Sequence, residues 1–69
     1  MGDLRLGSRL KEMRTAAGLT QQGLADKASV SRKTINTVEN GVFVPSTVLA
    51  LELARALNTT VETIFYLKD

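Results

Sequence analysis

Residues 20 to 40 contain two short helical patterns separated by only a few residues. Each pattern follows a hydroxyl residue that can cap a helix, Thr20 before Gln21 and Ser31 before Arg32. Apolar residues then recur at helical spacing, at Leu24, Ala25, Ala28, Ile35 and Val38. The segment from Ala28 to Val30 is all that remains to reverse the chain. The sequence therefore predicts two short helices that meet at a tight elbow.

A turn of three to four residues between two short helices is the geometry of a helix-turn-helix. With its apolar stripe buried, the second helix turns four polar residues outward and carries a fifth on its flank: Lys33, Asn36, Thr37, Asn40 and Arg32. Lysine and arginine bond to guanine, asparagine bonds to adenine, and threonine touches the thymine methyl group in a DNA major groove. The face can therefore read bases, although a polar face that is simply solvated remains the alternative.

Further blocks along the chain extend this pattern. From about Leu6 to Leu67 the sequence resembles lambda-repressor-like, or XRE-family (Cro/C1-type), helix-turn-helix domains. The blocks that carry the resemblance are LTQQGLADKA, VSRKTINTVENG, VPS, LALELARAL and TTVETIF. Several blocks in fixed order are far more specific than a lone helix-turn-helix window. The resemblance implies a compact all-α, five-helix DNA-binding domain over residues 1–69, with the helix-turn-helix at about 20–40.

Two positions depart from the family pattern. Gly23 stands where relatives usually carry a helix former, and glycine inside a helix costs about 0.5 to 1 kcal/mol relative to alanine. Ser29 stands at the elbow, where relatives commonly have glycine, and serine adopts a positive φ only at some cost. Neither change removes a DNA-contacting group, so we expect them to affect stability more than function.

The resemblance implies a transcriptional regulator that binds double-stranded DNA sequence-specifically. We expect a repressor that acts as a homodimer on an inverted-repeat operator, with the second helix of the motif in the major groove. Base contacts are expected from Arg32, Lys33 and Thr37, with Asn36 as a weaker candidate. Phosphate contacts are expected from five residues: Thr20, Gln21, Gln22, Ser31 and Asn40.

The first helix is expected to carry the stripe Leu6, Leu10, Met13 and Ala17, and Gly18 supplies a C-cap. Arg14 lies beside this stripe. Family members pair an arginine and a glutamate across the core at the positions of Arg14 and Glu39, so the resemblance implies a structural ion pair. An exposed Arg14 that binds a phosphate is the alternative.

After Gly41, which suits a helix C-cap, the loop Val42 to Val44 is apolar, and we expect one of its residues to fill the core. Ser46 is expected to cap a helix over residues 47–57 that is apolar almost all round and therefore central and buried. Thr59 or Thr60 is then expected to cap a last helix with the stripe Val61, Ile64 and Phe65. By resemblance a dimer seam is placed at Ile64, Tyr66 and Leu67; the alternative is that these residues complete the monomer core.

The charge of the chain is unevenly distributed. Residues 1 to 33 carry seven cations and three anions, whereas residues 34 to 69 carry two cations and four anions. A polyanion would meet the first half, although two ordinary solvated surfaces remain possible. The chain has no cysteine and no histidine, which excludes disulfides and thiolate or imidazole metal sites. No nucleophile and base lie at a spacing that indicates a catalytic site, so we expect neither an enzyme nor a cofactor.

The sequence has no apolar run of membrane-spanning length and no signal-peptide pattern at its start. We therefore expect a soluble cytoplasmic protein of a prokaryote or phage, associated with the nucleoid and not with a membrane. A chain of 69 residues leaves no room for a separate sensor, so no small-molecule ligand is expected. Alternatives are a DNA-binding antitoxin, a restriction-modification controller or, in a different class, a helical protein-interaction module.

Overall fold

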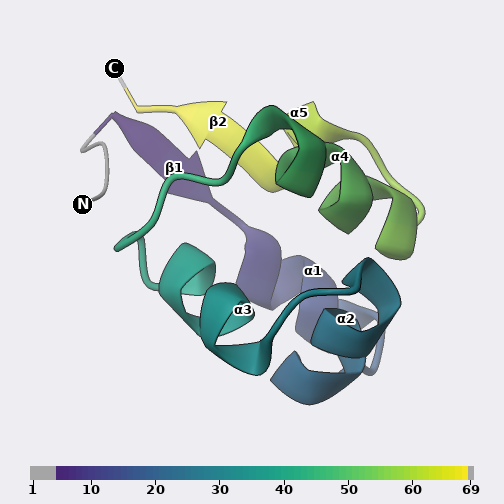
Figure 1. Ribbon diagram of the computed structural model, residues 1–69. Helices are drawn as coiled ribbons and strands as arrows, with labels where there is room; N and C mark the ends of the chain where they lie inside the picture. The colour runs from purple at the N-terminus through teal and green to yellow at the C-terminus, as the bar shows by residue number, and fades with distance from the viewer. Residues whose placement is uncertain (1–4, 69) are drawn as a thin grey trace.

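The computed structural model of the protein describes residues 5–68, which form five helices and two short strands (Figure 1). In chain order these are β1 (Leu6–Ser8), α1 (Leu10–Ala16), α2 (Gln21–Ala28), α3 (Arg32–Glu39), α4 (Thr47–Ala56), α5 (Val61–Ile64) and β2 (Phe65–Leu67). The predicted all-α architecture of five helices is confirmed, and the two strands are a small addition to it. No helix in the described part combines the length and the apolar character needed to cross a membrane.

Hydroxyl side chains begin three of the helices, as the sequence predicted. Thr20 Oγ1 accepts a hydrogen bond from Gly23 N at 2.9 Å at the start of α2. Ser31 Oγ accepts from Thr34 N at 3.1 Å at the start of α3, and Ser46 caps α4 in the same way. Each cap satisfies a backbone donor that has no partner within its helix, which fixes where the helix begins.

The elbow between α2 and α3 turns on Ser29, which has φ 58° and ψ 43°. This is the left-handed conformation, which serine adopts at a cost because its Cβ crowds the following carbonyl oxygen. Ser29 N donates to Asp26 O, and Val30 N donates to Ala25 O, so the conformation closes the end of α2. The expectation that Ser29 adopts a positive φ at the elbow is confirmed.

Replacing Ser29 with glycine should raise the free energy of unfolding by up to about 1 kcal/mol. The native φ strain is relieved, and the larger unfolded-state entropy of glycine offsets part of the gain. Thermal unfolding measures the effect, with about 4 to 8 °C expected per kcal/mol in a domain of this size. Asn58→Gly is the matched control, because Asn58 has φ 55° and asparagine tolerates this region better than serine. Equal shifts for both variants would contradict the prediction.

β1 and β2 join the two ends of the described chain in an antiparallel pair, in the register Leu6 with Leu67, Gly7 with Tyr66 and Ser8 with Phe65. The predictions of helix for Leu6 and Phe65 are therefore wrong. Leu6 has helical spacing from Leu10, but its backbone belongs to a strand, and α1 begins four residues later. The stripe is also wrong at Ala17, which follows α1 and is exposed.

The two faces of this strand pair differ. Gly7 lies against the ring of Tyr66, and a Cβ on Gly7 would overlap the ring atoms. The guanidinium carbon of Arg9 stacks over the same ring, 4.2 Å from its centroid. Because side chains alternate along a strand, Leu6, Phe65 and Leu67 project from the opposite face. Gly7 thus makes room for an aromatic ring on one face, while the other face is apolar except for Ser8.

The core draws on all five helices and on β2, through Leu10, Leu24, Ala25, Ala28, Ile35, Val38, Leu49, Ala50, Leu53, Ala54, Ile64 and Phe65. α4 buries one side only, because Val48 is 70% exposed and Leu51 is 56% exposed. The prediction of a central helix that is buried all round is therefore wrong. Val48 and Leu51 therefore expose apolar side chains on the outer side of α4.

The loop from Val42 to Val44 follows the turn at Gly41, whose φ of 72° confirms the expected C-cap. Its backbone is held to α3, since Val42 N and Phe43 N both donate to Thr37 O at 3.0 and 3.3 Å. All three apolar side chains of the loop are nevertheless exposed. The prediction that one of them fills the core is wrong, because Val44 lines a groove with Pro45 and Phe65 and does not enter the core.

Candidate nucleic-acid interface

Two cations occupy the first turn of α3. Arg32 and Lys33 are both exposed, and neither makes a hydrogen bond or ion pair with any residue from 5 to 68. On the opposite side of the helix, Ile35 and Val38 are buried in the core. α3 is therefore oriented as its sequence pattern predicts, with the apolar stripe inward and two unpaired positive charges outward.

Farther along the same face, Asn36 and Thr37 are half-buried and Asn40 is exposed. Asn40 Nδ2 donates to Asn36 Oδ1 at 3.1 Å, which leaves the Nδ2 hydrogens of Asn36 free. Thr37 Oγ1 donates to Thr34 O at 3.0 Å, so its hydroxyl hydrogen is used within the helix. The face therefore offers amide donors, a hydroxyl acceptor and a methyl group, which are groups that can meet base edges.

The start of α2 combines free backbone donors with polar side chains. The first N–H groups of a helix have no intrahelical partners, and the helix dipole makes this end attractive to anions. Thr20 and Gln22 are exposed and Gln21 is half-buried at this end. Gln22 Nε2 donates to Asp26 Oδ1 at 2.8 Å, which uses one of its amide hydrogens. A phosphate oxygen could bind here through backbone N–H groups and the remaining side-chain donors.

Arg14 and Glu39 form an ion pair between α1 and α3. Arg14 Nε donates to Glu39 Oε2 at 2.6 Å, and Arg14 Nη2 lies 3.3 Å from Glu39 Oε1. Arg14 Nη1 also donates to Leu19 O at 2.8 Å, which fixes the segment leading to α2. The side chains are only 10% and 2% exposed. The alternative in which an exposed Arg14 binds phosphate is therefore wrong, because the guanidinium is enclosed.

The hydrogen bond that Arg14 donates to the Glu39 carboxylate raises the pKa of Arg14, against an opposing effect of burial. Arginine already titrates far above neutral pH, so Arg14 remains charged wherever the protein is folded. A third residue joins the pair, since Gln21 Nε2 donates to Glu39 Oε1 at 3.1 Å. One carboxylate thus connects α1, the start of α2 and the end of α3.

The residues assigned to the dimer seam do not lie on one surface. Ile64 is fully buried in the core, so its prediction as an interface residue is wrong: its side chain already packs within its own chain. Tyr66 and Leu67 are exposed, but they are consecutive in β2 and project to opposite faces. Tyr66 carries the stacked Arg9 on its side. Leu67 shares the apolar face of the strand pair with Leu6 and Phe65.

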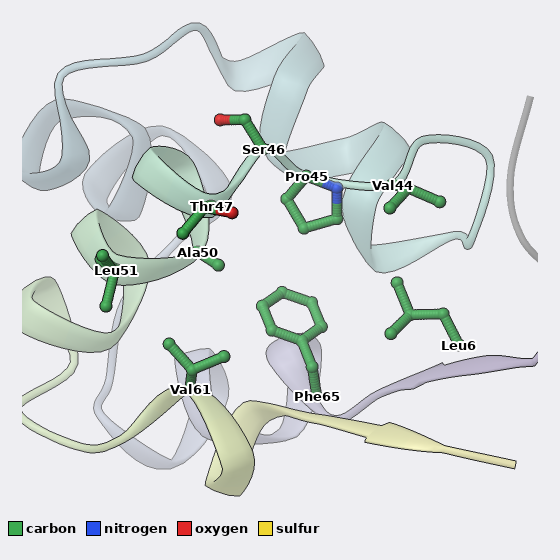
Figure 2. A pocket seen from close by; sticks show the side chains of 9 residues that line it. All are labelled: Leu6, Val44, Pro45, Ser46, Thr47, Ala50, Leu51, Val61 and Phe65. Atoms are coloured by element: carbon green, nitrogen blue, oxygen red, sulfur yellow. The ribbon is translucent and has the colours of Figure 1, made fainter.

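That apolar face borders a groove of about 240 Å³. Figure 2 shows Phe65 and Val61 pointing across it toward α4 and the segment that precedes α4. The lining residues are Leu6, Val44, Pro45, Ser46, Thr47, Ala50, Leu51, Val61 and Phe65. The groove is almost entirely apolar, and it lies between the strands and the helix that carries the exposed Leu51.

Sequence reasoning missed two parts of this surface. Leu51 was assigned to the core, whereas it lies on the exposed side of α4. Sequence reasoning also missed the bond between Gln21 and Glu39, for which no sequence signal exists beyond the family pairing. Among the described residues, no group of three or more histidine, cysteine or acidic side chains could hold a metal ion.

Comparison with known proteins agrees with this geometry. A family model described as a helix-turn-helix domain matches residues 5–64. YgzD of Bacillus subtilis, an uncharacterized HTH-type transcriptional regulator, is 34% identical over 62 residues, which cover 90% of this chain and 94% of YgzD. An uncharacterized HTH-type transcriptional regulator of Methanothermobacter thermautotrophicus is 43% identical over 61 residues, with 87% and 88% of the two chains covered.

A solved structure shares the fold as well. The restriction-modification controller protein C.AhdI of Aeromonas hydrophila superposes with a TM-score of 0.76 at 41% sequence identity, covering 78% of this chain and 82% of its own. The family consists of DNA-binding regulators rather than enzymes. The chain belongs to the XRE, or lambda-repressor-like, family of helix-turn-helix transcriptional regulators.

Proposed function

We propose that the protein is a sequence-specific repressor that binds an inverted-repeat operator in the cytoplasm as a homodimer, with α3 in the major groove. The observation that carries this proposal is the pair of exposed cations on the first turn of α3, Arg32 and Lys33, which make no hydrogen bond or ion pair within residues 5–68. Unpaired charges on a helix whose other side is packed into the core are available for an outside partner. Duplex DNA is the partner that this family binds.

The length of α3 supports phosphate contacts at its two ends and base contacts between them. A helix of this length, Arg32–Glu39, extends about 12 Å, close to the roughly 12 Å width of a major groove. Ser31 lies at one end, and Gln21 and Asn40 lie at the other, because Gln21 bonds to the neighbouring Glu39. The proposed phosphate contacts from Thr20, Gln21, Gln22, Ser31 and Asn40 would therefore flank the proposed base contacts from Arg32, Lys33, Asn36 and Thr37. Phosphate contacts fix the register, and base contacts choose the sequence.

The test is selection of bound fragments from a pool of random duplex DNA, followed by sequencing, at two salt concentrations. The proposal expects enrichment of an inverted repeat whose half-sites are centred about one helical turn apart, near 34 Å. It also expects binding to weaken steeply as salt rises, because counterions are released from the duplex. Retention without sequence preference, or no retention at physiological salt, would contradict the proposal.

The groove supports the proposed homodimer. Val44, Leu51 and Leu67 expose apolar surface around it, and Leu67 is 71% exposed. A domain of 69 residues has a small core, so covering such a surface contributes substantially to stability. A two-fold contact buries the same patch on both copies, which is how most homodimers form. We propose that the seam contains Leu67 with Leu51 and Val44, and that Tyr66 lies outside it.

Replacing Leu51 with aspartate should make the protein monomeric at micromolar concentration, because a charge would be buried at the centre of the seam. Sedimentation velocity reports the oligomeric state. Affinity for the inverted repeat should fall by about 10² to 10⁴, since the second half-site no longer binds in a linked step. Val48→Asp is the matched control, because Val48 is exposed on the same helix but lies beside Ser29 and Val30. A dimer that survives Leu51→Asp would contradict the assigned seam.

The similarity to C.AhdI favours a second candidate within the same biochemical function. That protein is a restriction-modification controller, and it is 41% identical to this chain. A controller or an antitoxin would use the same DNA-binding surface under different biological control. The genes that flank the selected operator distinguish these roles from a general repressor. The helical protein-interaction module is disfavoured, because family membership assigns the domain to DNA binding.

A further inference from the structure

The geometry points to Glu39 as a positioning residue that orients the side-chain amide of Gln21 toward a DNA phosphate. This inference rests on the proposed function, in which Gln21 contacts the backbone at the start of α2. Glu39 itself would not touch DNA, because its side chain is only 2% exposed. Glu39 would affect DNA binding only through the hydrogen bond that it accepts from Gln21.

The bond joins Gln21 Nε2 to Glu39 Oε1 at 3.1 Å. Glu39 is held from the other side by Arg14, through Nε at 2.6 Å and Nη2 at 3.3 Å. Arg14 is fixed in turn by its bond to Leu19 O, just before the start of α2. The carboxylate is therefore held by hydrogen bonds from both sides, and it lies between α1 and the start of α2.

An ionised carboxylate only accepts hydrogen bonds, so it accepts the Nε2 end of the glutamine amide and disfavours the Oε1 end. Nε2 has two hydrogens, one directed to Glu39 and the other free. Without Glu39 the side-chain amide of Gln21 could flip and present Oε1 to the phosphate. The phosphate would repel this oxygen. Glu39 thus selects the donor end of Gln21 for an anion.

A negative charge close to a DNA backbone would ordinarily oppose binding. Here the charge of Glu39 is balanced by Arg14, which lies in contact with it and is also buried. The pair supplies a directed acceptor to Gln21 without a net negative charge near the proposed phosphate site. This arrangement explains why a glutamate can lie next to Asn40, another proposed phosphate contact.

The experiment is a double-mutant cycle on affinity for the selected operator. Gln21→Ala should lower the affinity of the wild-type protein by about tenfold or more, because a hydrogen bond to a charged group is lost. In a Glu39→Gln background, the same substitution should lower affinity by less than about twofold, because an amide at this position can donate as well as accept and no longer selects the donor end of Gln21. An undiminished effect of Gln21→Ala in that background would overturn the inference.

Arg14→Lys is the matched control. It keeps a cation beside Glu39 and lacks the guanidinium that reaches Leu19 O, so it disturbs the buried pair while the acceptor for Gln21 remains. The Gln21→Ala effect should persist at about tenfold in this background. If the Gln21→Ala effect is lost in both the Glu39→Gln and the Arg14→Lys backgrounds, general destabilisation explains the loss and the inference is overturned. If Gln21→Ala has no effect even in the wild-type protein, the proposed phosphate contact fails, and the inference fails with it.

A measurement on the wild-type protein without DNA keeps the inference testable if Glu39→Gln does not fold. The sequence has only two glutamines, Gln21 and Gln22, so their side-chain amide signals in ¹H–¹⁵N NMR are readily distinguished. One amide hydrogen of Gln21 should exchange with water at least about tenfold more slowly than those of Gln22, which bonds to Asp26 on the exposed surface. Equal exchange would overturn the orientation by Glu39 while leaving the proposed DNA binding intact.

Discussion

Replacing Arg14 with methionine should lower the free energy of unfolding by about 3 to 5 kcal/mol, because the buried carboxylate of Glu39 would lose its charged partner. Stabilities of about 0.05 to 0.15 kcal/mol per residue are typical, so such a loss would leave much of this small domain unfolded. Urea denaturation followed by circular dichroism measures the change. The bond to Leu19 O would be lost as well, which adds to the effect.

Arg55→Met is the control for this prediction. Arg55 pairs with Glu52 at 3.3 Å, but the side chains are 81% and 36% exposed, so the loss should stay below about 1 kcal/mol. The pKa of Arg14 is raised on folding, so its contribution is present below the unfolded pKa and disappears only as pH rises through the folded value. The Arg14 effect should therefore be unchanged between neutral pH and about pH 10. Equal losses for Arg14→Met and Arg55→Met would contradict the account of a buried pair.

Replacing Arg32 and Lys33 together with alanine should lower affinity for the selected operator by about 2 to 6 kcal/mol, or roughly 30-fold to more than 10⁴-fold. Both cations lie on the outward first turn of α3, where a base contact contributes about 1 to 3 kcal/mol each. Binding curves at fixed salt give the change, and a repeated selection should show lost preference at the matching positions.

The control removes two cations from elsewhere. Arg55→Ala with Lys68→Ala changes net charge by the same amount, at exposed positions on α4 and after β2. It should weaken binding only through the general electrostatic attraction, with the base preference unchanged. If this variant loses as much affinity as the α3 variant, total charge rather than the α3 surface governs binding.

The helix starts could be predicted from sequence because their causes are local. Thr20, Ser31 and Ser46 each accept a backbone hydrogen bond within one turn, so the residue type and the next few positions decide the outcome. The orientation of α3 was also predictable, since Ile35 and Val38 fix which side faces the core. The likeness to a known family then supplied Arg14 and Glu39 as partners, a contact that no local pattern could give.

The strand pair could not be predicted, because its cause is distant along the chain. Leu6 and Leu67 pair across nearly the whole sequence, and strands of three residues are too short to show alternation. One signal was available in Gly7, since a glycine within a proposed helical stretch weakens that assignment. Its reason became visible only with Tyr66 against it.

Leu51 was predicted to be buried and is exposed, whereas Ile64 was predicted at a dimer seam and is buried within its own chain. Both residues are apolar and at helical spacing, and the sequence does not say which apolar face meets the rest of the chain and which meets solvent or a partner. The packing of α4 on α2 and of α5 on α4 decides this. An apolar surface that is exposed to solvent has the same sequence pattern as a core.

Titration of ¹⁵N-labelled protein with the selected duplex, followed by ¹H–¹⁵N NMR, locates the DNA-binding surface. If α3 reads DNA, the largest shifts occur in the backbone and side-chain amides of residues 20–22 and 31–40, with small shifts at Leu51, Val61 and Leu67. Shifts concentrated around the apolar groove, with α3 unaffected, would contradict the claim that α3 is the surface that reads DNA.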